Sequence, residues 1–396
     1  MQDRSATGPL AGLRVLELGQ LIAGPFCGQL LGDMGAEVVK VEPPSSERRR
    51  GGDPMRDWGQ GEVPTWWRVI ARNKLSIALD LSDAADQATA RELAAQADIL
   101  IENFRPGTLE KWGLAPEVLM AANPRLIVVR VSGYGQTGPY AQRAGFGGIG
   151  EAMGGWRAIV GEPDRAPARM GVSIGDSLAA TYACMGALAA LHERERSGLG
   201  QVIDVALYES VLQVMESLVP EQAINGHARR RTGSILPGIA PSNVYPCSDG
   251  EYLIGANGDA IFARLAEAME QPELARDERY ATHTARGANQ TALDTLIGEW
   301  TRSLTVEQLE ALMIEHAVPA GRIYGAVDML DDPHFAERGA IVRVPDAELG
   351  EVAMQGVFPK FSRTPGGIRR GAPLGVGQDT AEVRERWLGT NREAAQ

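Results

Sequence analysis

The chain has 396 residues, of which 44% are hydrophobic and 23% are charged, and this composition excludes an intrinsically disordered protein. Lysine and arginine number 39 against 51 aspartate and glutamate, so the net charge of −12 argues against nucleic acid or an anionic membrane as a partner. Three widely separated cysteines indicate neither a disulfide framework nor a Cys-x-x-Cys metal site, and residues 1–9 contain no apolar signal core, so we expect a cytoplasmic protein.

The first third of the chain alternates short apolar strands with helices. Helices are predicted over residues 24–32, 83–96 and 107–122, and strands over 14–18, 37–42, 75–81, 98–101 and 125–131. This order predicts an α/β fold with a mostly parallel sheet that helices cover on both faces. Ligands bind such sheets at the carboxyl ends of the strands, so the segments that follow the strands are the first candidates for a site.

A long loop without clear periodicity, residues 43–67, separates the second predicted strand from the third. From Lys40 to Lys74 the sequence contains eight Lys/Arg and five Asp/Glu, a net charge of +3 inside an acidic protein. The triplet Arg48–Arg50 lies in this window. These basic residues either line an anion-binding pocket or belong to a solvated loop, and the sequence alone permits both.

The pattern changes after a predicted long helix over residues 208–225. A Gly- and Pro-rich linker leads to residues 243–254, whose Ser-Asp-Gly centre is typical of a hairpin turn, and helical patterns follow at 259–270, 290–303 and 305–315. We therefore predict a large domain over residues 1–225, a smaller α+β domain over 226–325, and a return segment, 326–396, that completes the large domain.

The segment Glu102-Asn103-Phe104-Arg105-Pro106-Gly107 follows a predicted strand, and Lys111 lies one turn into the next helix. Phe104 or Arg105 can stack on a flat ring, Asn103 can bind the edge of that ring, and Arg105 or Lys111 can meet a phosphate. An adenine–phosphate ligand suits this combination, and so does a capped turn with Pro-Gly punctuation. Arg143 is likewise either a ligand contact or a surface charge.

Asp176 precedes a long run of small and apolar residues, 178–191. At the start of a helix, free N–H groups and the positive end of the helix dipole favour a carboxylate. Asp176 is therefore either a nucleophile or an ordinary N-cap. The apolar run is shorter than the roughly 20 residues that span a bilayer, so we expect no membrane segment.

Two common types of site do not fit the first half of the chain. Gly19-Gln-Leu-Ile-Ala-Gly24 follows the first strand, but its glycines do not have the Gly-x-Gly-x-x-Gly spacing and no Walker A sequence occurs, so we expect neither NAD nor FAD. All five histidines lie after residue 191, which excludes a local His-based zinc site. We expect no bound metal.

Taken together, the motifs resemble the family III CoA-transferases, of the formyl-CoA transferase or carnitine CoA-transferase type. The resemblance spans nearly the full chain and is carried by Leu10–Leu18, Ala23–Pro25, Gly32–Glu42, Asn73-Lys74, Glu102–Gly107, Ser132–Pro139 and the helix start at Gly175-Asp176. It implies a Rossmann-like large domain made from both chain ends, a small middle domain, and a homodimer whose two chains are interlinked like rings.

The resemblance makes Asp176 the nucleophile. Its carboxylate would attack an acyl-CoA to give an aspartyl–acyl anhydride, and the released CoA thiolate would then form an aspartyl-CoA thioester that passes CoA to a small carboxylic acid. CoA is thus a substrate and product, and no tightly bound cofactor is expected. Carried over residue by residue, the CoA contacts are Ile22, Ala23, Leu79, Asn103, Phe104, Arg105, Lys111, and Arg143 to Phe146.

Two departures from the family pattern stand out. Some members have a basic residue just after the second strand, where this chain has Pro43, so Lys40 or the Arg48–Arg50 group would have to supply that charge. The glycine-quartet loop of the formate/oxalate branch is missing, and oxalate is therefore not expected as a substrate.

Other functions compete with CoA transfer. The α-methylacyl-CoA racemase branch of the fold uses a histidine upstream of the equivalent aspartate, and this chain has none there, so transfer is favoured. A non-catalytic CoA-binding protein would keep the Asn103–Lys111 pocket without needing Asp176, and a lyase or dehydratase is a further alternative. Arg169 and the segment Gly233–Gly238 can bind a second carboxylate, which makes succinyl-CoA and a small dicarboxylic or hydroxy acid the expected pair.

Overall fold

The computed structural model describes residues 7–46, 50–61 and 63–389. The described residues of 1–156, 170–220 and 333–396 form one compact unit, and residues 157–169 and 221–332 form a second. The middle domain expected from the sequence falls inside the second unit. That unit also takes in residues 157–169, because Gly233 and Arg231 donate hydrogen bonds to the backbone oxygens of Gly161 (3.0 Å) and Glu162 (3.1 Å).

The first unit is built on a six-stranded sheet with the order β3-β2-β1-β4-β5-β6, in which every neighbouring pair is parallel. The strands are β1 (Arg14–Glu17), β2 (Glu37–Glu42), β3 (Lys74–Ala78), β4 (Ile99–Glu102), β5 (Ile127–Ser132) and β6 (Val202–Ala206). The α/β fold and the parallel sheet expected from the alternation are confirmed. The strand order reverses between β1 and β4, so the loops that follow these two strands are neighbours.

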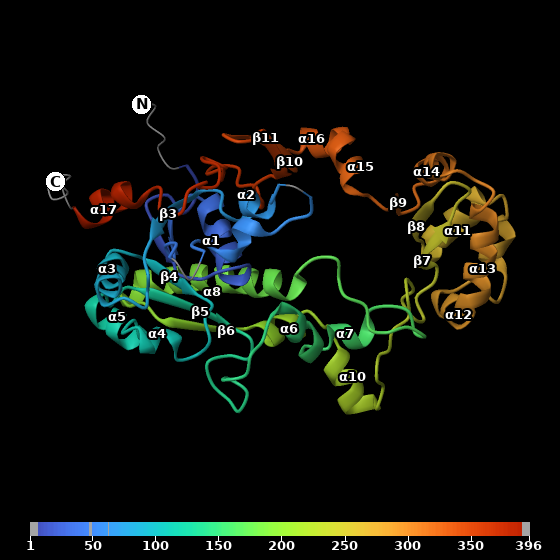
Figure 1. The fold of residues 1–396 in the computed structure, drawn as a ribbon. Coiled ribbons are helices and arrows are strands. Elements are labelled where there is room, and N and C mark those ends of the chain that lie inside the picture. Colours follow the sequence, from blue (N-terminus) through green and yellow to red (C-terminus); the bar gives the residue numbers. More distant parts are fainter. Residues whose placement is uncertain (1–6, 47–49, 62, 390–396) are drawn as a thin grey trace. The chain divides into compact units, whose positions relative to one another are not determined.

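Helices cover both faces of this sheet (Figure 1). Val15 and Val38 face α1 (Ala23–Asp33) and α8 (Ile174–Ser197), whereas the next residues, Leu16 and Val39, belong to the core on the other face. That second core is completed by α3 (Ala84–Ala95), α4 (Thr108–Lys111), α5 (Pro116–Ala122) and α17 (Thr380–Leu388). Burial on both faces explains why the strands are continuous apolar runs in the sequence.

By length and composition alone, helix α8 could cross a membrane, and it is the one helix in the described part of the chain that could. A single helix of this kind is weak evidence for a membrane span, because the core helix of a soluble protein passes the same test. Its residues Ala179, Ala183 and Ala187 are fully buried against the sheet. Met185, on another side of the helix, is 59% exposed. The helix therefore packs as a covering helix of the core and leaves one apolar side open.

Two helices expected to be long are broken. The pattern over 107–122 forms α4 and α5 separately, because Gly113 adopts a left-handed conformation (φ +65°) and Pro116 starts the second helix. The pattern over 208–225 forms α9 (Leu207–Leu212) and α10 (Leu218–Asn225), with Glu216 at φ +52° between them. A sequence period of 3.6 survives a short interruption, so periodicity alone does not reveal these breaks.

The C-terminal return segment covers the edge of the sheet at β3. It contains α16 (Pro333–Glu337) and an antiparallel hairpin of β10 (Ile341–Asp346) and β11 (Gly350–Gln355). Asn73 accepts a hydrogen bond from the Arg369 N–H (2.7 Å), and Asp379 accepts one from the N–H of Ser76 in β3 (2.8 Å). The return segment thus pairs with β3 and with the residue before it, along an edge that would otherwise be open to other strands.

The second unit has its own core around a three-stranded antiparallel sheet in the order β7-β8-β9. The Ser-Asp-Gly turn expected from the sequence joins β7 to β8, and Cys247 N–H donates to Gly250 O there (2.8 Å). The elements of this unit are β7 (Ser242–Pro246), β8 (Glu251–Gly255), α11 (Asp259–Ala268), η2 (Pro272–Arg276), α12 (His283–Ala288), α13 (Gln290–Thr301), α14 (Val306–Glu315), β9 (Ala320–Arg322) and α15 (Ala326–Asp331). The remaining short helices of the chain are η1 (Pro54–Asp57), α2 (Trp66–Ile70), α6 (Gly147–Met153) and α7 (Trp156–Ile159).

Candidate active site

Two loops meet at the carboxyl edge of the sheet, one after β1 and one after β4. Asn103 joins them: its Oδ1 accepts a hydrogen bond from the N–H of Gln20 (2.8 Å), and its Nδ2 donates to Gln20 O (2.8 Å). A Cβ on Gly19 would lie 2.7 Å from Asn103 Oδ1, so this close approach requires a glycine. The amide of Asn103 therefore holds the loop Gly19–Ile22, and its direct contact with CoA stays a prediction.

The loop Gly19–Ile22 leads into α1, whose N-terminus faces the same edge. The N-cap residue Ile22 makes no side-chain capping hydrogen bond, so the first turn offers its backbone N–H groups to an anion. Ile22 and Ala23 are 8% and 3% exposed. A contact between these two residues and CoA would therefore come from their backbone rather than from their side chains.

The loop after β4 presents an aromatic ring and two cations. Phe104 is half-buried and packs edge-on against Trp112, with ring centroids 5.0 Å apart, while Arg105 and Lys111 are exposed. This geometry leaves the two cationic groups accessible for a phosphate and places the ring of Phe104 at the base of the same loop.

Glu102 anchors that loop to the sheet. Its Oε2 accepts a hydrogen bond from the N–H of Phe104 (2.7 Å), and its Oε1 accepts one from Arg130 Nε (2.7 Å). Arg130 also binds Glu110 in α4 (2.9 Å), so one guanidinium ties the strand end to the next helix. Burial raises the pKa of Glu102, and the hydrogen bond from Arg130 opposes that rise only in part.

The structure corrects the role expected of Lys40. Its side chain is fully buried, and its Nζ lies 2.9 Å from Glu17 Oε1, 2.8 Å from Asp53 Oδ2 and 2.7 Å from Gly19 O. Three oxygens thus surround the ammonium group beneath the β1–α1 loop, and it has no exposed surface from which to meet a phosphate. Leu79 is 1% exposed and its side chain belongs to the core, so its contact with CoA stays a prediction.

The alternative source of positive charge was the triplet Arg48–Arg50. Arg50 is exposed and forms a surface ion pair with Asp57 (2.8 Å). Arg48 and Arg49 lie outside the described residues.

Asp176 occupies the first turn of α8, and Ser173 is the N-cap of that helix. The interpretation of Asp176 as an ordinary N-cap is therefore wrong, because the carboxylate belongs to the third residue of the helix. Asp176 lies against the first residue of α6: a Cβ on Gly147 would be 2.0 Å from Asp176 Oδ2, and a Cβ on Gly175 would be 2.8 Å from Gly147 O. The half-buried carboxylate thus sits where the N-terminal ends of two helices come together.

The segment from Arg143 to Phe146 runs into this same place. The guanidinium of Arg143 stacks over the ring of Tyr140 at 3.5 Å from the centroid, and both residues are exposed. Phe146 is 71% exposed and is the N-cap residue of α6, directly before the glycine that touches Asp176. An exposed aromatic ring beside the candidate nucleophile is consistent with a binding surface.

Arg169, expected to bind a second carboxylate, is exposed and belongs to the second unit, as do residues Gly233–Gly238. Asp176 belongs to the first unit. The role of Arg169 stays a prediction.

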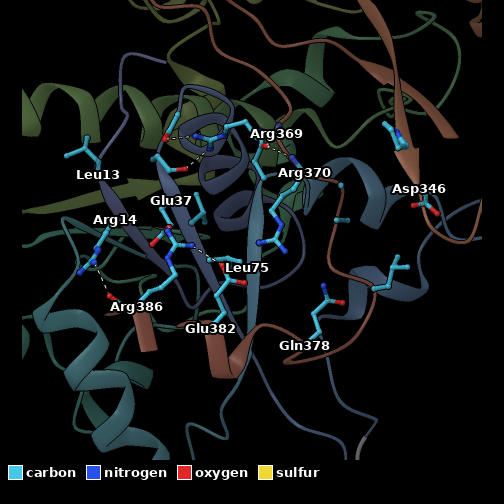
Figure 2. A pocket seen from close by; sticks show the side chains of 18 of the residues that line it. Leu13, Arg14, Glu37, Leu75, Asp346, Arg369, Arg370, Gln378, Glu382 and Arg386 are labelled. Carbon is cyan, nitrogen blue, oxygen red and sulfur yellow. Dashed lines mark hydrogen bonds and ion pairs between the residues drawn. The ribbon is translucent and has the colours of Figure 1, made fainter. Parts of the chain in front are cut away.

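A large cavity lies at the opposite, amino-terminal edge of the sheet (Figure 2). Its volume is about 1050 Å³, and the return segment closes it with Arg369, Arg370 and Arg386. Arg386 pairs with Glu37 and Glu382, and Arg370 pairs with Asp379 (3.0 Å). These charges are neutralised within the protein, and the cavity contains none of the residues expected to bind CoA or to react.

Two features of the site were not predicted from the sequence. The sequence gives no sign of a role for Gly147, which only its contact with Asp176 reveals. Glu17, Asp53 and Lys74 form a buried cluster with Lys40, for which a signal existed: a glutamate interrupts an apolar strand, and in the sheet Glu17 pairs in register with Lys40. Within the described residues, no group of three or more His, Cys, Asp and Glu side chains is placed to hold a metal ion.

Comparison with known proteins identifies the family of this chain. A family model described as CoA-transferase family III matches residues 10–380. The succinyl-CoA–D-citramalate CoA-transferase of Chloroflexus aurantiacus is 56% identical over 99% of this chain and 97% of its own length. The succinyl-CoA:mesaconate CoA-transferase of Haloarcula hispanica is 36% identical over 97% of this chain and 98% of its own length.

Solved structures show the same fold. A CaiB/BaiF family protein from Brucella suis superposes with a TM-score of 0.85 at 36% identity, covering 96% of this chain and 100% of that one. The match of family model, sequence and structure extends over nearly the whole chain. The protein therefore belongs to CoA-transferase family III.

Proposed function

We propose that this CoA-transferase moves CoA from succinyl-CoA to a small dicarboxylic acid of the citramalate or malate type. Relatives named for D-citramalate, L-malate and mesaconate as acceptors, all with succinyl-CoA as donor, align over at least 93% of this chain. The identity of 56% to the one named for D-citramalate makes that acid the first acceptor to test.

The position of Asp176 is the single observation that carries the proposal. Its carboxylate lies in the first turn of α8 and against the first residue of α6. A helix N-terminus favours negative charge, and the anionic carboxylate is the nucleophilic form. The N–H groups of the two helix ends also suit the negative charge that develops on a carbonyl oxygen during acyl transfer.

The proposed reaction begins when an oxygen of Asp176 attacks the thioester carbonyl of succinyl-CoA. The C–S bond breaks, CoA leaves as a thiolate, and an aspartyl–succinyl anhydride forms. The thiolate then attacks the aspartyl carbonyl, succinate departs as a carboxylate, and an aspartyl-CoA thioester remains. The acceptor carboxylate repeats these two steps in reverse order, which yields the new acyl-CoA and frees Asp176.

This sequence transfers no net proton and needs neither a metal nor a tightly bound cofactor, because the aspartate itself carries the activated group. It is compatible with the absence of histidine from the first 191 residues. The α-methylacyl-CoA racemase alternative is not favoured, since it requires a histidine upstream of Asp176 and the relatives are named as transferases.

CoA is proposed to bind along the carboxyl edge between the β1–α1 loop and the β4–α4 loop. Arg105 and Lys111 are exposed there and would bind phosphate groups. Phe104, Arg143 and Phe146 would contact the adenine and the pantetheine arm, and Arg169 would bind the free carboxylate of the dicarboxylic acid.

We further propose that the protein acts in the cytoplasm as an interlinked homodimer, the assembly that the family resemblance implies. The first unit leaves large apolar side chains exposed on α6, α8, β6 and α9, including Met185 (59%), Val202 (42%) and Leu212 (41%). A second copy of the chain would bury them. Light scattering should give twice 42.4 kDa, and the mass should persist on dilution because interlinked chains cannot separate without unfolding.

The first experiment is intact-mass spectrometry of the protein incubated with succinyl-CoA, followed by hydroxylamine treatment. We expect a CoA adduct on the wild type that hydroxylamine removes, and no adduct on Asp176→Asn. An adduct on both proteins would remove Asp176 as the nucleophile. Deuterium incorporation at the acyl α-carbon without any adduct would favour racemisation instead.

The acceptor is tested with a panel of D-citramalate, L-malate, mesaconate, glutarate and oxalate. We expect the hydroxy dicarboxylates to give the highest kcat/KM and oxalate to give no detectable turnover. Arg169→Ala should raise the KM of the dicarboxylate while the KM of a monocarboxylic acid changes little. An unchanged dicarboxylate KM would refute the role of Arg169.

A further inference from the structure

The β1–α1 loop is held by side chains from three other parts of the chain. Lys40 donates to Gly19 O (2.7 Å), Asn103 binds both backbone groups of Gln20 (2.8 Å each), and Asp53 accepts from the N–H of Leu21 (3.1 and 3.2 Å). Three consecutive residues are thus fixed by separate side chains. A loop that merely connects a strand to a helix would not require hydrogen bonds from three separate side chains.

Leu21 has a left-handed backbone conformation, with φ at +64°. A residue with a branched side chain pays about 1–2 kcal/mol to adopt this conformation, so the surrounding structure must impose it. The carboxylate of Asp53 is the group that meets the Leu21 N–H in this conformation. The left-handed conformation of Leu21 turns the chain, so that Ile22 and Ala23 start α1 next to the point between β1 and β4 where the strand order reverses.

Asp53 is itself rigidly placed. It is 2% exposed, its N–H donates to Glu42 Oε2 (2.9 Å), and its side chain also accepts from the N–H of Met55 (2.9 Å). Arg56 locks Glu42 in turn, with Nε 2.6 Å from Oε2 and Nη2 2.7 Å from Oε1. Asp53, Met55 and Arg56 belong to the segment 43–67, the long loop that the sequence marks as a candidate for function, and Glu42 at the end of β2 anchors them to the sheet.

Beneath the β1–α1 loop, two buried lysines and two buried carboxylates pair with one another. Lys40 bridges Glu17 and Asp53, and Lys74 lies 2.7 Å from Glu17 Oε2 and donates to Pro25 O in the first turn of α1 (2.6 Å). Burial lowers the pKa of Lys74, whereas for Lys40 the carboxylates of Asp53 and Glu17 outweigh burial and raise the pKa. Lys40 is thus firmly cationic, and losing one of its partners leaves a buried charge without compensation.

We propose that Asp53 is a positioning residue for CoA: it holds Leu21 in its left-handed conformation and, through Lys40, fixes the loop whose backbone meets the ligand. This inference rests on the proposed binding of CoA at the β1–α1 loop. Asp53 does not touch the reacting atoms. Its removal should weaken CoA binding by loosening the loop and should change the chemistry at Asp176 much less.

The test compares Asp53→Asn and Asp53→Ala with Asp33→Asn. Asp33 is the matched control, because it is also a buried aspartate (3% exposed) in an ion pair, with Arg72 (2.5 Å), but it lies at the far end of α1. Dissociation constants for CoA alone are measured by calorimetry, together with hydrogen exchange of the peptide that covers residues 18–30. Adduct formation with saturating succinyl-CoA gives the rate of the chemical step.

We expect Asp53→Ala to raise the Kd of CoA about tenfold and to speed exchange at Leu21 and Ile22, with a smaller change in Asp53→Asn, which keeps an acceptor oxygen. The rate of adduct formation at saturation should change less than about threefold. Asp33→Asn should lower the melting temperature without these changes. Equal losses of CoA affinity in the Asp33 and Asp53 variants would overturn the proposal.

The two proposals can fail separately. If the wild type binds CoA but forms no aspartyl adduct, the transferase mechanism fails and the Kd comparison still tests Asp53. If Asp53→Ala does not fold, Asp53→Asn together with the exchange data decides the matter. Unchanged Kd and unchanged exchange in a folded Asp53→Asn and a folded Asp53→Ala would refute the positioning role.

Discussion

The two edges of the parallel sheet both carry arginines, but they use them differently. At the amino-terminal edge, Arg369 donates to the carbonyl oxygens of Gly32, Gly35 and Ala36 at the end of α1, and the neighbouring arginines pair with carboxylates (Figure 2). At the carboxyl edge, Arg130 and Arg56 also pair with carboxylates, but Arg105 and Lys111 are exposed. A helix C-terminus attracts cations and a helix N-terminus attracts anions, so the direction of α1 alone gives the two edges opposite preferences.

This comparison explains why the cavity at the amino-terminal edge does not suit the proposed reaction. Its arginines satisfy acidic side chains and helix carbonyls, and they stabilise the return segment against the sheet. The carboxyl edge instead offers uncapped helix N–H groups at α1 and the carboxylate of Asp176 between α6 and α8. The predictions below test this difference, beginning with the change that should have the largest effect.

Replacing Asp176 with Asn should abolish transfer, with a loss of about 10⁴-fold or more in kcat, because an amide cannot form the anhydride or the thioester. CoA binding should be almost unchanged, since the amide is isosteric. Steady-state kinetics and the Kd for CoA check both parts. Substantial residual activity that survives the exclusion of contaminating wild-type protein would contradict the mechanism.

Gly147→Ala should lower kcat about 100-fold, because a Cβ would lie 2.0 Å from Asp176 Oδ2 and must displace the carboxylate. The KM of succinyl-CoA should move far less than kcat. Gly367→Ala is the matched control at the opposite edge: no heavy atom lies within 4 Å of the Cβ position there, so activity should persist. Similar kcat values for the Gly147→Ala variant and the wild type would show that the nucleophile does not depend on this contact.

Arg105→Ala and Lys111→Ala should each raise the KM of succinyl-CoA about tenfold at low salt, and the effect should shrink as ionic strength rises. Arg370→Ala, which removes an arginine from the amino-terminal edge, should lower the melting temperature and leave KM unchanged. If Arg370→Ala raised KM as much as Arg105→Ala, the division between the two edges would not hold.

Much of the fold is predictable because the strands and helices of the large unit repeat a simple pattern. The parallel sheet, the covering helices and the hairpin at Cys247–Gly250 follow from local periods and turn residues. The breaks within residues 107–122 and 208–225 depend on single residues, Gly113 and Glu216, whose left-handed conformations a periodic pattern does not report.

The sequence indicates a candidate site residue when its side-chain chemistry alone suggests a role. It does not indicate a residue whose role depends on which neighbours the fold brings close to it. The charges of Asp176 and Arg105 at the ends of elements mark them as candidates in the sequence, and their roles stay predictions. Lys40 is a sequence candidate for phosphate binding because Pro43 stands where some family members have a basic residue, but the structure buries Lys40 between Glu17 and Asp53. Gly147 has no side chain to attract notice, so only the spatial approach of Asp176 identifies it.

The smallest expected effect concerns the pH dependence of stability at the carboxyl edge. Burial acts to raise the pKa of Glu42, but Arg56, Lys40 and Ser76 outweigh it and leave the pKa below its usual value. A depressed carboxyl pKa means that the folded state binds fewer protons, so Glu42 contributes stability above its unfolded pKa and loses it as the pH falls through the folded value. Glu42→Gln should therefore destabilise the protein by about 1–3 kcal/mol at pH 7, and the difference in stability from the wild type should narrow below the ordinary glutamate pKa.

The control is Glu382→Gln at the amino-terminal edge. Glu382 pairs with the half-exposed Arg386, so its replacement should change stability little at high or low pH. Thermal unfolding of the three proteins between pH 7 and about pH 3 checks this, and a constant difference between Glu42→Gln and the wild type across that range would contradict the linkage.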